Sequence, residues 1–327
     1  MTTPSTSILF VFPGQGSQYP GIGKDLFNAF ESVRRLYGQA SEVLDYDLAQ
    51  LSFDDPEGKI NLTRYTQPAL LTHSIACLQA FQEMTNGEVR PGVTAGHSLG
   101  EYSALVAAGA LDFPSALQLV KTRGQLMADL GDGEMEALPL PIESAQELAE
   151  QHYCAVAACN LPDQTVVGGR VEDLDALVND FQERYPGKRT ARLKTEGAFH
   201  TFYMIEAALR FREALSGAPF SSPAIEVLSN SSGIFHRKNP DSIRAGLFSQ
   251  LFNPVQWHAN LMHAVTQGCD TIIEFGGGIG KGETAAEKKP NLASIIKKSF
   301  RRQPTPPRYL SVINQETLSE AVSVFRL

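Results

Sequence analysis

The sequence predicts an α/β fold in which a small βαββαβ subdomain of the ferredoxin-like type is inserted into a larger domain built on a parallel sheet. Two observations predict this fold. Apolar strand-like runs alternate with helical patterns up to Leu130, which is typical of a parallel sheet covered by helices. The order then changes to strand, helix, strand, strand, helix, strand between Glu134 and Thr195. We therefore expect a large domain of residues 1–132 and 197–327 and an inserted subdomain of residues 133–196.

The large domain is expected to begin with the strand "SILFVF" (residues 7–12), a continuous apolar run typical of a strand buried on both faces. This strand is followed by the glycine-rich loop "PGQGSQ". Three further short apolar runs are expected to be strands: residues 93–96, 224–230 and 271–278. A last short strand is expected after Arg308. The expected helices share apolar residues at helical spacing and are residues 26–44, 66–84, 101–111, 113–130, 201–215 and 242–252, with a short one at the C-terminus.

The inserted subdomain has shorter elements. Four runs have the apolar pattern of strands: residues 134–140, 154–160, 164–169 and 189–195. Two amphipathic runs between them are expected to be helices: residues 144–153 and 171–185.

The composition is that of an ordinary globular protein. The 327 residues are 43% hydrophobic and 20% charged, which is ample for a sizeable core. The net charge of -8 argues against a general nucleic-acid binder. The four cysteines form no C-x-x-C pair, so we expect neither a disulfide framework nor a zinc site. The first apolar run is short and follows no basic segment, so we expect no signal peptide, no membrane span and a cytoplasmic protein.

A serine between two glycines is a candidate nucleophile. "GHSLG" (residues 96–100) follows a strand and precedes a helix. It matches the G-x-S-x-G nucleophile elbow, whose small flanking residues let the chain turn sharply and expose the serine oxygen. The alternative is an ordinary strand–turn–helix junction with a capping serine. In the functional interpretation, Ser98 is the nucleophile.

A serine hydroxyl needs a base to take its proton. Of the seven histidines, His200 is the best candidate, because it follows "GAF" where the inserted subdomain ends. His73 is expected to be a packed or surface residue on a helix. No aspartate between Ser98 and His200 stands at a convincing strand end, so a backbone carbonyl is the alternative group to orient the base.

Two backbone amides are candidates for an oxyanion hole. The N–H of Leu99 follows the nucleophile at the start of a helix. The glycines of "PGQGSQ" let the backbone of Gln15 approach closely. The alternatives for this loop are a phosphate cradle or a plain turn. The loop lacks the lysine of a Walker A motif and the third glycine of a dinucleotide fingerprint.

Arg123 stands in "LVKTRGQLM", within a predicted helix. Its spacing alone indicates a solvated surface arginine. A buried position becomes reasonable where a substrate carboxylate has to be bound, because a guanidinium holds a carboxylate through two parallel hydrogen bonds.

Six motifs occur together in one order: "FPGQGSQ", "TQPAL", "GHSLGEYSAL", "VKTRGQLM", "GAFH" and "NPVQW". This order resembles that of malonyl-CoA:acyl carrier protein transacylases, both the stand-alone fatty-acid enzyme and the acyltransferases of polyketide synthases. The resemblance extends from Phe12 to about Gly282. It implies that the large domain is hydrolase-like and that the inserted subdomain is ferredoxin-like.

The resemblance implies roles for the residues of the matching motifs. Ser98 looks like the acyl-accepting nucleophile and His200 like its base. Gln15 and Leu99 resemble the oxyanion-hole donors through their backbone N–H groups. The main-chain carbonyl of Gln250 matches the group that orients the histidine, which would explain the missing aspartate.

The resemblance also implies how the acyl group is held. Arg123 matches the arginine that pairs with the free carboxylate of malonyl. The residues that resemble the acyl pocket are His97, Asn160, Phe199 and Met204. Three segments depart from the family pattern: "TFYM" after the histidine, "GEMEALPLP" and "EFGGGIGKGE". These departures indicate a specialised acyltransferase of secondary metabolism that acts in trans on a synthase.

The activity implied is a ping-pong transfer of malonyl from coenzyme A to the phosphopantetheine thiol of an acyl carrier protein, by a monomer with no cofactor or metal of its own. One alternative is transfer of another acyl group between two carriers. Others are a thioester hydrolase that clears stalled carriers and a catalytically idle carrier-docking module. Arg123 argues against the hydrolase, and the intact pair of Ser98 and His200 argues against the idle module.

A basic segment near the C-terminus is a candidate carrier-docking surface. Carrier proteins are generally acidic, and this chain is acidic too, so docking needs a local basic patch. The patch is expected at Lys281, Lys297, Lys298, Arg301 and Arg302. The alternative is a solvated surface stretch.

Overall fold

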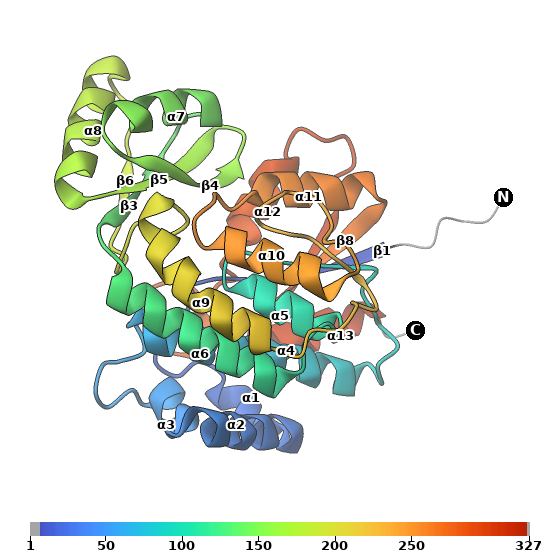
Figure 1. Cartoon of the computed structure of the whole chain (residues 1–327). Coiled ribbons are helices and arrows are strands. Elements are labelled where there is room, and N and C mark those ends of the chain that lie inside the picture. Colours follow the sequence, from blue (N-terminus) through green and yellow to red (C-terminus); the bar gives the residue numbers. More distant parts are fainter. Residues whose placement is uncertain (1–6, 326–327) are drawn as a thin grey trace.

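The computed structural model describes residues 7–325, which form two sheets (Figure 1). The larger sheet is parallel and has the order β7-β2-β1-β8-β9. Its strands are β1 (Ser7–Phe12), β2 (Val93–Gly96), β7 (Glu226–Val227), β8 (Cys269–Phe275) and β9 (Arg308–Val312). The smaller sheet lies apart, at the top left of Figure 1, and is antiparallel with the order β4-β5-β3-β6. The predicted α/β fold with two separate sheets is confirmed.

Helices cover both faces of the parallel sheet because alternate side chains of β1 point to opposite faces. Phe10 and Phe12 belong to one buried cluster, which includes residues of α2, α4 and α13. Leu9 and Val11 belong to a second cluster, with residues of α11 and α12. The helices of the large domain are α1 (Lys24–Ala29), α2 (Glu31–Leu44), α3 (Leu48–Phe53), α4 (Thr63–Met84), α5 (Gly100–Ala107), α6 (Phe113–Leu130), α9 (Ile205–Gly217), α10 (Pro240–Gln250), α11 (Trp257–Thr266), α12 (Ala293–Phe300) and α13 (Gln315–Phe325), with short 3₁₀ helices η1 (Phe202–Met204) and η2 (Ala285–Glu287).

The smaller sheet and its two helices lie within residues 134–193. They are β3 (Glu134–Leu138), α7 (Ile142–Gln151), β4 (Ala155–Leu161), β5 (Gln164–Gly169), α8 (Val171–Arg184) and β6 (Ala191–Leu193). Their own core includes Leu148, Leu174 and Phe181. Strand β4 joins the large domain through Val255, whose carbonyl accepts from Cys159 N at 2.8 Å and whose N–H donates to the Ala157 carbonyl at 2.9 Å.

Several predicted elements of the large domain are wrong in extent; the helix expected over residues 101–111, for example, ends at Ala107. The helix expected over residues 26–44 is broken at Phe30, which has an extended backbone (φ -120°, ψ 125°) and packs against the edge of the core. The strand expected over residues 224–230 pairs with β2 only at Glu226–Val227. Beyond that point Leu228 forms an isolated bridge with Phe235, and the Asn230 side chain donates to the Gly96 carbonyl at 2.6 Å.

Other differences lie at helices. The first turn of the helix expected over residues 201–215 is the 3₁₀ helix η1. The helices α3, α11 and α12 were not predicted, because each is short and tertiary packing rather than a long periodic pattern decides it. Within residues 7–325, no helix is long and apolar enough to cross a membrane. The same residues contain no group of three His, Cys, Asp or Glu side chains that could hold a metal ion.

Candidate active site

Ser98 stands at a sharp turn between β2 and α5. Its backbone is left-handed (φ 52°), a conformation that non-glycine residues adopt at a cost and that is common at functional sites. Gly96 and Gly100 are required here, because a Cβ on Gly96 would lie 1.8 Å from the Gly100 carbonyl carbon and one on Gly100 would lie 2.1 Å from the Phe12 carbonyl oxygen. The two glycines therefore let the turn close against the end of β1, and Ser98 stays partly exposed.

His200 lies beside Ser98, 102 residues further along the chain. Its Nε2 is 2.6 Å from Ser98 Oγ, and its Nδ1 is 2.7 Å from the carbonyl oxygen of Gln250. A carbonyl only accepts hydrogen bonds, so Nδ1 carries the proton and Nε2 is free to accept the serine proton. Burial lowers the pKa of His200 to about 3, with the Arg123 guanidinium acting in the same direction.

Arg123 is buried, with 1% of its surface exposed, and lies at the same place. The interpretation from spacing as a surface residue is therefore wrong. Its Nη1 donates to Gln67 Oε1 at 2.9 Å, and its Nη2 donates to Gln250 Oε1 at 3.0 Å. Nη2 is also 3.4 Å from Ser98 Oγ. A positive charge thus stands next to the candidate nucleophile, and two neutral amides fix its position.

The amides of Gln15 and Leu99 belong to the two loops that meet at Ser98. In the described chain neither N–H has a protein acceptor, so both are available to a ligand. The Gln15 side chain is held by the start of α4, where its Nε2 donates to Thr63 Oγ1 at 3.0 Å. Ser17 Oγ donates to the Gly14 carbonyl at 2.7 Å and closes the same loop.

The four residues expected in the acyl pocket fall into two groups. His97 Nε2 and Asn160 Oδ1 are 2.8 Å apart, so the large domain and β4 meet beside the elbow. The His97 ring also contacts Trp257 edge-on, with 5.4 Å between centroids. Phe199 and Met204 belong to the core cluster, and Met204 has no exposed surface. That Phe199 and Met204 line the acyl pocket stays a prediction.

Residues 9–276, which hold all these groups, match the acyl transferase domain family. This chain belongs to that family. It is 34% identical over 330 residues to the malonyl CoA-acyl carrier protein transacylase of Bacillus subtilis, with 98% of each chain covered. It is 35% identical over 277 residues to a polyketide biosynthesis malonyl CoA-acyl carrier protein transacylase of Bacillus velezensis, which covers 83% of this chain and 93% of that one. A solved complex of a type II polyketide synthase acyl carrier protein with its malonyl-transacylase is also similar (TM-score 0.86, 33% identity, 98% of this chain and 100% of that one). The family expected from the motifs is confirmed.

The sequence analysis did not identify several residues of this acyl transferase site. Gln67 and the side chain of Gln250 hold Arg123, and three more polar residues lie behind the elbow: Glu101, Asn230 and His236. Glu101 belongs to the elbow motif "GHSLGE", and its place on the first helical turn was the one available signal. Gln67 and Gln250 are bound to Arg123 across 56 and 127 residues, and Asn230 and His236 are bound to the elbow motif across 132 and 135 residues, which no local pattern indicates.

The low pKa of His200 leads to a prediction on pH. A base has to be neutral to accept a proton, and a group with a pKa of about 3 stays neutral through the weakly acidic range. Acylation of Ser98 by an acyl thioester is therefore expected to keep its rate from pH 8 down to about pH 5. Rapid-quench mass spectrometry of the intact protein would measure this rate. A fall with a midpoint near 6.5, the ordinary histidine value, would contradict the prediction.

Proposed function

We propose that this acyltransferase moves a malonyl-type group from coenzyme A, through an acyl-Ser98 intermediate, to the phosphopantetheine thiol of an acyl carrier protein. The observation that carries the proposal is the buried guanidinium of Arg123, 3.4 Å from Ser98 Oγ. A buried cation next to the nucleophile favours a substrate with a free carboxylate. The names of the relatives, which include polyketide-associated proteins, support the same substrate and a transfer in trans.

The first half of the reaction uses the geometry directly. His200 Nε2 takes the proton of Ser98 Oγ as the oxygen attacks the thioester carbon. The carbonyl oxygen becomes an oxyanion, which the N–H groups of Gln15 and Leu99 stabilise. When the carbon–sulfur bond breaks, His200 returns the proton to the leaving sulfur, and coenzyme A departs as a thiol.

The second half runs in reverse with a different thiol. The carrier's phosphopantetheine thiol gives its proton to His200, and its sulfur attacks the acyl-Ser98 carbon. The same two amides stabilise the second oxyanion, and the Ser98 oxygen leaves with the proton from His200. The carrier supplies the phosphopantetheine group, and the steps need no metal or cofactor bound to the enzyme.

Mass spectrometry of the protein with malonyl-CoA, before and after addition of a holo-carrier, tests this function. We expect a malonyl adduct that disappears as malonyl-carrier forms. Release of free malonate without a carrier would favour the hydrolase alternative, and no reaction would favour the idle docking module. Reaction only with an acylated carrier as donor would favour transfer between carriers. That the enzyme is monomeric stays a prediction.

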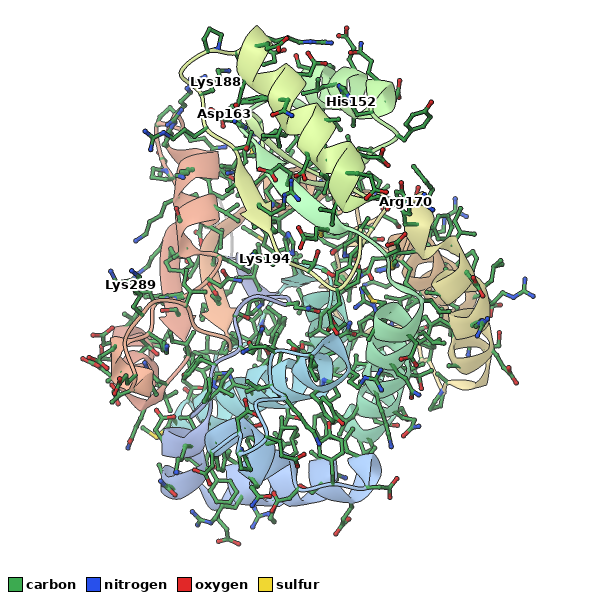
Figure 2. All side chains as sticks on the ribbon, turned by 90° about the vertical axis from the view of Figure 1, so that its left-hand side faces the viewer. His152, Asp163, Arg170, Lys188, Lys194 and Lys289 are labelled. Carbon is green, nitrogen blue, oxygen red and sulfur yellow. The ribbon has the colours of Figure 1, made fainter. Side chains whose placement is uncertain are left out.

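The basic patch is the proposed docking surface for the carrier. Its five residues, Lys281, Lys297, Lys298, Arg301 and Arg302, are exposed; the last four lie on α12 or directly after it, and Lys281 lies before η2. The Arg301 guanidinium lies 3.7 Å from Asp163 on the turn between β4 and β5, so the patch reaches the inserted subdomain. Asp163 and Lys188 of that subdomain and Lys289 of the large domain lie along the left side of Figure 2. The patch therefore lies on the large domain and contacts the inserted subdomain at Asp163.

Changing Lys297, Lys298, Arg301 and Arg302 together to glutamate is expected to raise the apparent KM for the carrier by about 10-fold or more at low salt. Complementary charge mainly speeds association, and salt screens it over about 8 Å at physiological ionic strength. Self-acylation from malonyl-CoA should survive. The matched control changes Arg34 and Arg35 on α2, which lies at the bottom of Figure 1. Unchanged carrier kinetics at low salt would show that docking lies elsewhere.

A further inference from the structure

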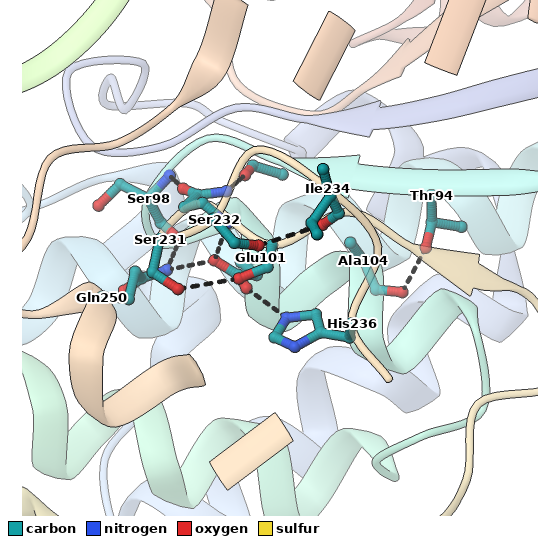
Figure 3. Close-up of polar contacts among 12 residues, drawn as sticks. Thr94, Ser98, Glu101, Ala104, Ser231, Ser232, Ile234, His236 and Gln250 are labelled. Carbon is teal, nitrogen blue, oxygen red and sulfur yellow. Dashed lines mark hydrogen bonds and ion pairs between the residues drawn. The ribbon is translucent and has the colours of Figure 1, made fainter. Parts of the chain in front are cut away.

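A buried carboxylate stands directly behind the nucleophile elbow. Glu101 has no exposed surface and lies in the first turn of α5. It accepts hydrogen bonds from His236 Nε2 at 2.6 Å, Gln250 Nε2 at 2.8 Å and the backbone N–H of Asn230 at 3.1 Å. Figure 3 shows Glu101 between His236, Gln250 and the Ser98 turn. We call Glu101, Asn230, His236 and Gln250 the elbow network.

Asn230 fixes the turn that carries the nucleophile. Its Oδ1 accepts from Ser98 N at 2.6 Å, and its Nδ2 donates to the Gly96 carbonyl at 2.6 Å. Gln250 Nε2 adds a bond to the Ser98 carbonyl at 2.8 Å. The strained backbone of Ser98 is thus held through its own N–H and its own carbonyl by two members of the network.

Gln250 connects the network to the other reacting groups. Its carbonyl oxygen accepts from His200 Nδ1 at 2.7 Å, and its Oε1 accepts from Arg123 Nη2 at 3.0 Å. Its Nε2 is bound to Glu101. A shift of this one residue would therefore displace both the base and the guanidinium.

We propose that His236 is a positioning residue for acyl transfer: by donating to Glu101 it completes the hydrogen bonds of that buried carboxylate and so holds Gln250 in place. A buried carboxylate is costly unless it is fully hydrogen-bonded. Within residues 7–325, His236 is the one histidine, lysine or arginine within 4.0 Å of the Glu101 carboxylate, and both side chains are buried (2% and 0% exposed). The other donors to Glu101, from Gln250 and Asn230, are neutral amides.

Loss of His236 has a definite consequence for the hydrogen bonds. Without the imidazole, the buried Glu101 carboxylate loses one of its hydrogen-bond donors, which is costly in the interior. The carboxylate and the Gln250 side chain that donates to it then shift. Because Gln250 Nε2 also holds the Ser98 carbonyl and Gln250 Oε1 accepts from Arg123, Ser98 and Arg123 lose their alignment with His200.

The chain makes room for His236 at Gly246, which lies inside α10. A Cβ at this position would lie 2.7 Å from His236 Cε1 and 3.2 Å from its Nδ1, so one methyl group would push the ring. Glycine inside a helix is less stable than alanine. The helix thus has a destabilising glycine where the His236 imidazole packs against it. This is a second observation which favours a requirement for the position of the His236 ring.

The test follows two rates in the wild type, His236→Ala, His236→Gln and Gly246→Ala. One is the reaction of Ser98 with a fluorophosphonate, which needs the serine and its base but no carboxylate binding. The other is acylation by saturating malonyl-CoA. His236→Ala is expected to lower both rates by roughly 10- to 100-fold, the size of a misplacement in a catalytic site. His236→Gln places an amide N–H near the imidazole Nε2 and is expected to restore both rates to within about threefold.

Gly246→Ala keeps the histidine but displaces it, and is expected to lower both rates less than His236→Ala does. In the double variant His236→Ala/Gly246→Ala the added methyl group meets no imidazole ring. The losses of rate caused by the two single substitutions should therefore not add. His152→Ala is the matched control, because His152 also bonds a carboxylate, Asp180 at 2.9 Å, but in the inserted subdomain. It should lower the melting temperature and leave both rates unchanged.

The outcomes are distinguishable. Wild-type rates in folded His236→Ala, or a folded His236→Gln that fails to recover, would overturn the inference. If His236→Ala does not fold, Gly246→Ala decides, and a wild-type rate there overturns it. The inference rests on the proposed Ser98–His200 pair. A wild type that does not react with the fluorophosphonate contradicts the proposed function, whereas equal reaction of wild type and His236→Ala contradicts the inference alone.

Discussion

Ser98→Ala is expected to abolish the covalent malonyl adduct and to lower malonyl transfer by on the order of 10⁶-fold, the loss found when a serine nucleophile is removed from a serine–histidine enzyme. The serine oxygen is the acyl acceptor, and His200 Nε2 stands 2.6 Å from it. Peptide mapping after treatment with malonyl-CoA should place the added mass on the peptide that contains Ser98.

Ser103→Ala is the matched control for that experiment. Ser103 lies in the same motif, on α5, but only 1% of it is exposed, so it cannot receive an acyl group. This variant should acylate at the wild-type rate. An adduct on another residue of the wild type, or an adduct that survives in Ser98→Ala, would show that the nucleophile is misassigned.

Arg123→Ala is expected to lower malonyl transfer by roughly 10- to 150-fold, because a hydrogen bond to a charged group is worth about 1.5–3 kcal/mol. Acetyl transfer should change little or rise, since acetyl has no carboxylate for the guanidinium to bind. The ratio of kcat/KM for malonyl-CoA to that for acetyl-CoA measures the effect. This ratio falls if Arg123 recognises the carboxylate, and it stays unchanged if the substitution only disorders the site.

The contacts of Arg123 with Gln67 and Gln250 make the control necessary. Arg123→Lys keeps the charge but cannot bond both amides and a carboxylate together, so it should retain part of the malonyl preference. Equal losses for malonyl and acetyl in Arg123→Ala would mean that the arginine only supports Gln250. A wild type that prefers neutral acyl groups would contradict the malonyl assignment.

Local signals predicted much of the fold. β1 is a continuous apolar run, and α6 has apolar residues at helical spacing. The strand order of the inserted sheet follows from its βαββαβ pattern. The short elements were harder. α11 and α12 pack on the sheet through Trp257 and Phe300, and few residues of each carry the apolar pattern.

For the site, the sequence by itself determined the elbow and the candidate nucleophile. "GHSLG" needs no distant partner, because the clash that Gly96 and Gly100 avoid lies within the motif and against the end of β1. The order of the six motifs then indicated the family and pointed to His200 and Arg123. The spacing of Arg123 alone predicted a surface position. A helical pattern shows only that a residue lies outside the apolar face of its own helix, and not what other segments pack against it.

Only the tertiary structure decided where Arg123 lies and what holds the base. Arg123 is buried because α4 supplies Gln67 and the end of α10 supplies Gln250, from 56 and 127 residues away. Glu101 meets His236 from 135 residues away. The physical reason is that a buried charge is stable only where several separate segments bring hydrogen-bond partners to it. Those segments become neighbours only when the parallel sheet has formed.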